Sequence, residues 1–123
     1  MADAKDKKIL VVEDDFLLLE MYSITLTAEG YEVLKASDGA DGLRLAETDQ
    51  PDLILLDLNM PSVSGFQVLA DFKERGITTP VVVISNTDEQ SAIDKTTELG
   101  AKEYVVKAHT NLDQIKEIVA KYA

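Results

Sequence analysis

Short runs of apolar residues recur along the chain, and longer segments with a helical period separate them. Residues 9–12 (ILVV), 53–56 (LILL) and 81–84 (VVVI) are uninterrupted runs, which are typical of parallel strands buried on both faces. A shorter run at residues 104–106 (YVV) predicts a further strand. Residues 31–36 (YEVLKA) alternate between apolar and polar positions, which predicts a strand with one wetter face at an edge of the sheet.

Each predicted strand is followed by a segment with helix start and stop signals. The first helix is expected at about residues 16–28, capped by Asp14 or Asp15 and stopped by Gly30. Four apolar residues fall along one side of this helix, the stripe that an amphipathic helix turns toward a core: Leu17, Met21, Ile24 and Ala28.

The later helices carry similar signals. Asp38 caps one helix that ends before Pro51, and Thr110 or Asn111 caps the last. The four are expected at about residues 39–50, 65–75, 88–99 and 111–122.

Five strand–helix units with short connections predict an α/β fold with a parallel sheet and helices on both faces. Five strands are too few for a closed eight-stranded barrel, so we expect a doubly wound, flavodoxin-like sheet of order 2-1-3-4-5. The 123 residues predict one domain, with its core at about residues 8–122 and a charged tail at residues 1–7. No effector domain is expected, although a piece cut from a longer regulator would look the same.

Composition excludes several classes of protein. The chain has no cysteine, which rules out disulfides, thiolate metal sites and a cysteine nucleophile. Its apolar runs are far shorter than a membrane span, and its first residues lack the apolar segment of a signal peptide, so a cytoplasmic location is expected. A net charge of −11 repels nucleic-acid phosphates and favours basic protein partners or divalent cations.

Candidate chemistry gathers at the ends of the predicted strands. Sheets of this order place their sites at the carboxyl ends of the strands, between the first and the third. Glu13 and Asp14 follow the first strand, and Asp57 ends the third. Ser85 ends the fourth strand and Lys107 follows the fifth, so we expect all five side chains at one edge.

Three carboxylates at one point require positive charge. Two carboxylates about 5 Å apart repel by roughly 3 kcal/mol at an effective dielectric constant of about 20. Lys107 supplies one cation, and an all-oxygen site favours Mg²⁺ as the second, with Mn²⁺ or Ca²⁺ as alternatives. Taken singly, Asp14 and Asp15 could merely cap the first helix and Asp57 a local segment, but the predicted convergence of Glu13, Asp14 and Asp57 favours a metal site.

The motifs together resemble a protein family. Residues 9–15 (ILVVEDD) and 57–61 (DLNMP), the strand that ends in Ser85, and residues 104–107 (YVVK) resemble the response-regulator receiver domain of bacterial two-component signalling. The resemblance covers about residues 8–122, and a single-domain, chemotaxis-regulator-like member is the best match.

The resemblance implies a phosphorylation site. Asp57 would accept a phosphoryl group from a phosphohistidine of a histidine kinase or phosphotransfer protein. The carboxylates of Glu13, Asp14 and Asp57 and the backbone carbonyl of Asn59 would hold Mg²⁺ (Mn²⁺ is possible), Glu13 through a water molecule. Lys107 would pair with a phosphoryl oxygen. Autodephosphorylation would follow, without turnover of an external substrate.

The resemblance also implies a switch. The Ser85 hydroxyl would turn toward the phosphate and Tyr104 would move inward, which changes a surface made of the fourth helix, fifth strand and fifth helix. That surface would bind a downstream protein partner, with the chain a monomer or a weak phosphorylation-linked dimer. Asn59, Asn86 and Thr87 occupy positions that tune access and the lifetime of the phosphoryl group.

One residue departs from the family pattern. Receiver domains usually follow the lysine with a proline in a cis peptide bond, but Ala108 follows Lys107 here. Because a cis bond before a residue other than proline costs about 3–4 kcal/mol, this loop either keeps that strain or runs differently.

Other functions on this fold need residues that the chain lacks. A flavodoxin-like cofactor site needs a phosphate cradle after the first strand, where residues 13–15 (EDD) would repel phosphate. A phosphatase of the haloacid-dehalogenase type needs a second aspartate at the position of Asn59. The remaining alternative is a non-phosphorylated interaction module, which metal-dependent phosphorylation of Asp57 would exclude.

Overall fold

A five-stranded parallel sheet forms the centre of the protein. The computed structural model describes residues 7–60 and 64–123, so most of the predicted tail, and residues 61–63 ahead of the predicted third helix, lie outside the described residues. The strands are β1 (Lys8–Val12), β2 (Glu32–Ala36), β3 (Leu53–Asp57), β4 (Val81–Ser85) and β5 (Glu103–Val106). Their order is β2-β1-β3-β4-β5 and every pairing is parallel, which confirms the predicted sheet.

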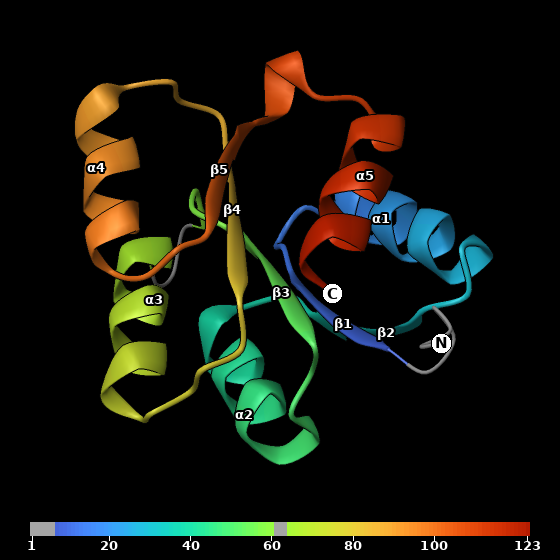
Figure 1. Cartoon of the computed structure of the whole chain (residues 1–123), viewed down its shortest axis with the longest axis horizontal. Coiled ribbons are helices and arrows are strands. Elements are labelled where there is room, and N and C mark those ends of the chain that lie inside the picture. The colour runs from blue at the N-terminus through green and yellow to red at the C-terminus, as the bar shows by residue number, and fades with distance from the viewer. Residues whose placement is uncertain (1–6, 61–63) are drawn as a thin grey trace.

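Helices cover both faces of this sheet (Figure 1). They are α1 (Phe16–Ala28), α2 (Gly39–Asp49), α3 (Gly65–Glu74), α4 (Gln90–Glu98) and α5 (Leu112–Tyr122). Helices α1 and α5 lie on one face, and α2, α3 and α4 lie on the other. A 3₁₀ turn, η2 (Lys107–His109), follows β5, and every described peptide bond is trans, including that between Lys107 and Ala108.

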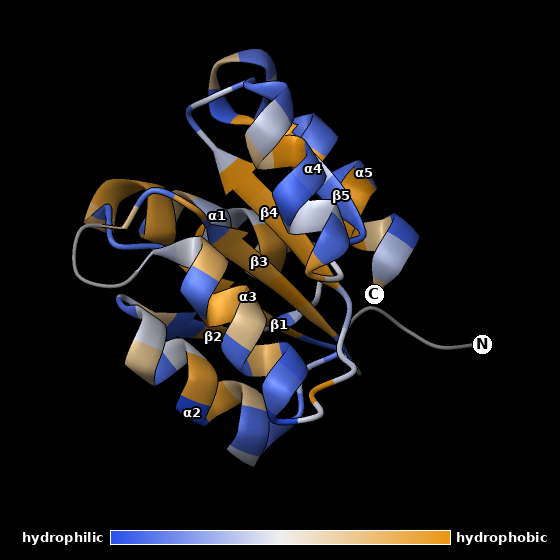
Figure 2. Ribbon diagram, turned by 90° about the vertical axis from the view of Figure 1, so that its left-hand side faces the viewer, coloured by the Kyte–Doolittle hydropathy of each residue, from blue (hydrophilic) through white to orange (hydrophobic). Residues whose placement is uncertain are grey.

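The central strands are apolar because their alternate side chains enter two separate cores. In β1, Ile9 and Val11 pack with α1 and α5, whereas Leu10 and Val12 pack with the opposite helices. All four are at most 1% exposed. Figure 2 shows that β3 and β4 are largely apolar, whereas the helices beside them carry many polar residues. None of the helices in the described part of the chain combines the length and apolar character that crossing a bilayer requires.

The structure decides between the candidate helix caps. Asp15 caps α1, since its Oδ1 accepts hydrogen bonds from the backbone N–H groups of Leu17 and Leu18. The carboxylate of Asp14 is therefore available to the strand-end site. Asn111, rather than Thr110, caps α5 through a reciprocal pair of hydrogen bonds with Gln114.

The predicted inner face of α1 was wrong. Leu17, Met21 and Ile24 are 72%, 45% and 66% exposed, and the buried side of the helix carries Leu19, Tyr22 and Leu26 instead. The helix is apolar on nearly every side, so two stripes of helical spacing compete in the sequence. The one that begins at Leu19 packs on the sheet, which leaves the other in solvent.

Candidate functional site

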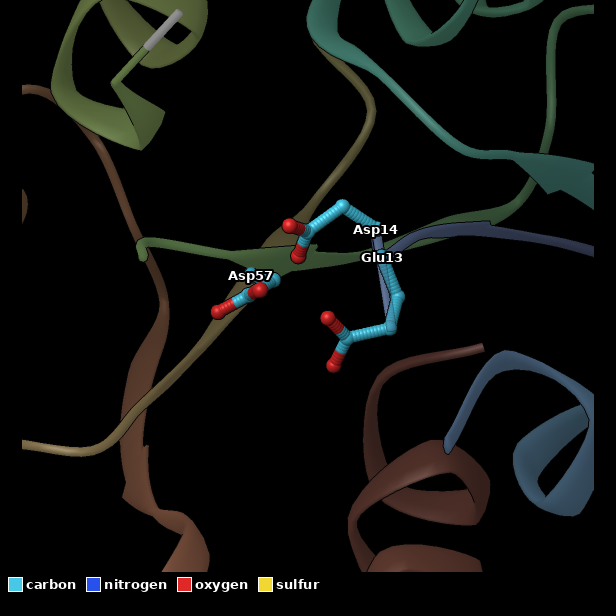
Figure 3. A group of neighbouring side chains, drawn as sticks. All are labelled: Glu13, Asp14 and Asp57. Carbon is cyan, nitrogen blue, oxygen red and sulfur yellow. The ribbon is translucent and has the colours of Figure 1, made fainter. Parts of the chain in front are cut away.

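Three carboxylates meet at the carboxyl edge of the sheet (Figure 3). Glu13 and Asp14 follow β1, and Asp57 ends the neighbouring strand β3. One oxygen from each carboxylate lies within 4.8 Å of the others, as the predicted convergence requires. Glu13 and Asp57 are 1% and 2% exposed, whereas Asp14 is exposed at the mouth of the cluster.

Lys107 brings a positive charge into the cluster from the turn η2, which follows β5, two places away from β3 in the sheet. Its Nζ lies 3.0 Å from Glu13 Oε1 and 3.3 Å from Asp57 Oδ1, and its side chain is only 15% exposed. Burial alone would lower the pKa of Lys107, but the two carboxylates outweigh it and raise that pKa. The ammonium is therefore charged throughout the physiological range.

The two buried carboxylates have opposite pKa shifts. Burial, and then the adjacent Asp57, raise the pKa of Glu13 to about 8 despite the opposing effect of Lys107. Burial also acts to raise the pKa of Asp57, but hydrogen bonds from Glu13 and the Asn59 N–H, together with the Lys107 charge, hold it below its ordinary value. Near neutral pH without metal, the pair therefore holds one proton, mainly on Glu13.

The cluster has the chemistry of a magnesium site. Glu13 Oε2 accepts the N–H of Asp15, but Oε1 is buried and accepts no hydrogen bond among the described residues. Lys107 is near this oxygen, yet its approach is off the direction that a hydrogen bond requires. A buried carboxylate oxygen left in this state suits a divalent cation, and a set of oxygens alone fits Mg²⁺.

On the other side of Asp57, the loop after β4 is hydrogen-bonded to Asn59. The Asn59 N–H donates to Asp57 Oδ1 at 3.0 Å. Its side-chain Oδ1 accepts the Ser85 hydroxyl at 3.1 Å and the Asn86 N–H at 2.8 Å. The backbone carbonyl of Asn59 was predicted to be a metal ligand and its side chain to lie at a tuning position, but this bridge was not predicted. The two-residue spacing after Asp57, with Ser85 at the end of the adjacent strand, was the available signal.

Tyr104 joins the same network from β5. Its hydroxyl donates to the backbone carbonyl of Thr87 at 2.7 Å, and the Thr87 N–H donates to Ser85 Oγ at 3.2 Å. The ring is half-buried in this arrangement. The structure thus brings every predicted site residue into one connected region at the carboxyl edge of the sheet.

Gly65 supports the site from the start of α3, and its role was not predicted from the sequence. A Cβ at this position would lie 2.6 Å from the Cα of Leu58 and 2.9 Å from the carbonyl oxygen of Asp57. Helix α3 therefore begins in direct contact with the end of β3, and only glycine permits that approach.

Comparisons with known proteins agree with this geometry. Residues 9–120 match the response regulator receiver domain family. The transcriptional regulatory protein CiaR of Streptococcus pneumoniae is 45% identical over 102 residues, which cover 81% of this chain and 44% of CiaR. The chemotaxis protein CheY4 of Vibrio cholerae has a TM-score of 0.88 at 27% identity, covering 95% of this chain and 98% of that one. The response regulator TrrA of Thermotoga maritima, in complex with Mg²⁺ and BeF, has a TM-score of 0.83 at 32% identity, covering 95% and 99%.

The chain belongs to the response regulator receiver domain family. Receiver domains are phospho-accepting signalling switches of two-component systems rather than enzymes that turn over a substrate, and they bind Mg²⁺ at an acidic site. The predicted family and fold are confirmed. The chain spans less than half the length of the curated relatives it matches.

Proposed function

We propose that Asp57 accepts a phosphoryl group from a phosphohistidine of a histidine kinase or phosphotransfer protein. A carboxylate oxygen of Asp57 attacks the phosphorus, and the P–N bond breaks with its electron pair left on the imidazole. The product is an acyl phosphate, which water later hydrolyses. The observation that carries this proposal is the buried Asp57 between a lysine 3.3 Å away and two further carboxylates.

The surrounding residues have separate roles in this proposal. The carboxylates of Asp14 and Asp57, the backbone carbonyl of Asn59 and, through a water molecule, Glu13 would hold Mg²⁺, or Mn²⁺ in its place. When bound, the ion would supply positive charge that offsets the charge of the transferring group. The Lys107 ammonium, which is paired with Asp57 in the free protein, forms an ion pair with a phosphoryl oxygen after transfer.

The signal leaves the pocket through the Ser85–Tyr104 side. Phosphorylation adds about −1.5 to −2 charges and three acceptor oxygens, which draw the Ser85 hydroxyl toward Asp57. Because Thr87 connects Ser85 to Tyr104, the change reaches the surface of α4, β5 and α5, where a downstream protein binds. Asn59, Asn86 and Thr87 line the path and tune the lifetime of the phosphoryl group.

The phosphodonor docks over the exposed apolar face of α1. Phe16 and Leu17 are 70% and 72% exposed, and only the helix cap Asp15 separates them from the pocket carboxylates of Glu13 and Asp14. A groove between α1 and α5 continues this face, with Met21 and Lys107 among its lining residues. A donor seated here reaches Asp57 beside Lys107. Since α1 carries no basic residue and Asp14 and Asp15 flank it, a donor with an apolar centre and a basic rim is complementary.

Intact-mass spectrometry with acetyl phosphate tests the proposal against a non-phosphorylated interaction module on the same fold. One added phosphoryl group in Mg²⁺ and none in EDTA is the expected result. An unmodified mass in both buffers, for folded protein that binds Mg²⁺, would favour the interaction module.

A further inference from the structure

We propose that the side chain of Asn59 is a latch that holds the loop after β4 in its unphosphorylated arrangement. The latch works because Asn59 accepts the single hydrogen bond that the Ser85 hydroxyl can donate, and a phosphoryl group on Asp57 needs that same hydrogen bond. This inference rests on the proposed function of Asp57, and it assigns the Asn59 side chain a role separate from its backbone carbonyl.

The first support is the number of donors that converge on one atom. Asn59 Oδ1 accepts both the Ser85 hydroxyl and the Asn86 N–H, at 3.1 and 2.8 Å. Ser85 is 0% exposed, so water does not offer its hydroxyl an alternative acceptor. A hydroxyl has a single proton to donate, and in this arrangement Asn59 receives it.

The second support is the way the loop is held together beyond Ser85. Its Oγ accepts the Thr87 N–H at 3.2 Å, and the Thr87 carbonyl accepts the Tyr104 hydroxyl at 2.7 Å. The Asn59 N–H donates in turn to Asp57 Oδ1. A continuous series of hydrogen bonds therefore connects Asp57 with Tyr104, and the Asn59 side chain is the part that faces Ser85.

Asn59 and a phosphoryl oxygen on Asp57 compete for the hydrogen bond from the Ser85 hydroxyl. The loop after β4 therefore has two alternative arrangements, one for each acceptor. When a phosphoryl oxygen on Asp57 accepts from Ser85, the bond from Ser85 to Asn59 must break. The Ser85 Oγ then moves relative to the Thr87 N–H, and the Thr87 carbonyl carries the Tyr104 hydroxyl with it. The hydrogen bond from Ser85 to Asn59 stabilises the unphosphorylated protein only. It therefore weakens the binding of a phosphoryl group or its mimic at Asp57 by the same free energy, because both arrangements use the same hydroxyl donor.

Replacing Asn59 with alanine distinguishes the latch from a purely structural role, because the two predict opposite changes in the binding of a phosphoryl mimic. If the side chain only ordered the pocket, Asn59→Ala would weaken the binding of a phosphoryl mimic. A latch predicts tighter binding, because the free state loses a hydrogen bond that the bound state does not have. The expected gain is roughly 2- to 12-fold, the effect of one net hydrogen bond.

The test is titration with beryllium fluoride in excess Mg²⁺, followed by the backbone amide resonances of the free and bound protein. Asn59→Ala should bind the mimic tighter than wild type, and its Asn86 N–H should exchange faster with solvent in the free state. In a Ser85→Ala background, Asn59→Ala should give no gain, because no hydroxyl remains to be released.

Each other outcome is decisive. Equal or weaker binding by Asn59→Ala, in a wild-type protein that does bind the mimic, overturns the latch and leaves the proposed function intact. Equal Asn86 exchange rates in the free proteins also overturn the latch. Failure of wild type to bind the mimic in Mg²⁺ contradicts the proposed function itself, and the latch falls with it.

Discussion

The Lys107 ammonium lies 3.3 Å from Asp57 Oδ1, although Asp57 ends β3 and Lys107 follows β5, a strand that does not pair with β3. The lysine side chain spans the end of β4 to reach the carboxylate, and it is 15% exposed in that position. This contact fixes a positive charge beside Asp57 before any ligand arrives. Such prearranged charge costs no reorganisation when a phosphoryl group is transferred.

Removing the lysine charge should impair phosphorylation. Lys107→Met keeps most of the side-chain volume but removes the charge-assisted contact, which is worth about 1.5–3 kcal/mol. We expect a loss of roughly 10- to 150-fold in the rate with acetyl phosphate, measured by intact mass against time. Lys116→Met, which removes exposed ion pairs with Asp113 on α5 and Glu29 at the end of α1, is the matched control and should react at the wild-type rate. Unchanged reactivity in Lys107→Met would separate this lysine from the chemistry.

Stability without metal should fall as the pH rises from about 5 to 9. Burial raises the pKa of Glu13 from 4.5 to about 8, so between these values the folded protein keeps a proton that the unfolded chain has lost. The stabilisation is therefore complete below pH 4.5 and disappears as the pH passes 8. The lowered pKa of Asp57 has the opposite effect on the pH dependence of stability. It stabilises the folded protein above pH 3.8, and this stabilisation is lost as the pH falls below that value.

Thermal melts in EDTA and in Mg²⁺ measure this effect. The Glu13→Gln variant should have a flatter melting temperature across the same range, because its amide does not titrate. Mg²⁺ should stabilise wild type more at pH 8 than at pH 6, since the ion competes with the Glu13 proton. A wild-type profile as flat as that of Glu13→Gln would show that Glu13 is already ionised at low pH.

A methyl group at Gly65 should disturb the pocket. The added Cβ of Gly65→Ala would lie 2.6 Å from the Leu58 Cα, so α3 or the end of β3 must move. We expect a cost of about 1–3 kcal/mol in the free energy of unfolding and weaker Mg²⁺ binding. Gly100→Ala is the comparison, because its Cβ meets open space and only its positive φ of 99° is strained. It should lose stability in denaturant titrations while Mg²⁺ binding stays the same.

The exposed face of α1 should matter for a protein donor and not for folding. Leu17 is 72% exposed, so Leu17→Ala should change the free energy of unfolding by less than about 0.5 kcal/mol. Leu26→Ala, on the buried side, should cost about 2–5 kcal/mol. Leu17→Ala should react normally with acetyl phosphate but slowly with a phosphorylated histidine phosphotransfer protein that serves wild type. Equal rates with that protein would place the donor elsewhere.

The order of the sheet and the position of its acidic site follow from the sequence for a local reason. The apolar runs of β3 and β4 each end in a polar residue, and that of β1 is followed by Glu13, so these polar residues mark both the strand ends and the site. The inward face of α1 did not follow, because consecutive Leu17, Leu18 and Leu19 offer more than one apolar stripe. Packing against the sheet selects between them, and that choice is not local.

The Asn59 bridge was also not predicted, although the spacing after Asp57 was a signal for it. The family resemblance implied a role for the backbone carbonyl of Asn59, but the direction of its side chain depends on the loop after β4. That loop is 26 residues away from Asn59 in the chain at Ser85. Gly65 could not be predicted for a similar reason. That a side chain at this position would collide with the end of β3 is visible only once α3 is placed against that strand.

The most direct test of the account is to identify the phosphorylated residue. Protein treated with acetyl phosphate and Mg²⁺ would be reduced with borohydride, which converts an aspartyl phosphate into homoserine, and then digested for peptide mass spectrometry. Homoserine at position 57 in wild type, and none in EDTA or in the Asp57→Asn variant, is the predicted result. A phosphoryl group on His109 or another carboxylate, with Asp57 unmodified, would contradict the account.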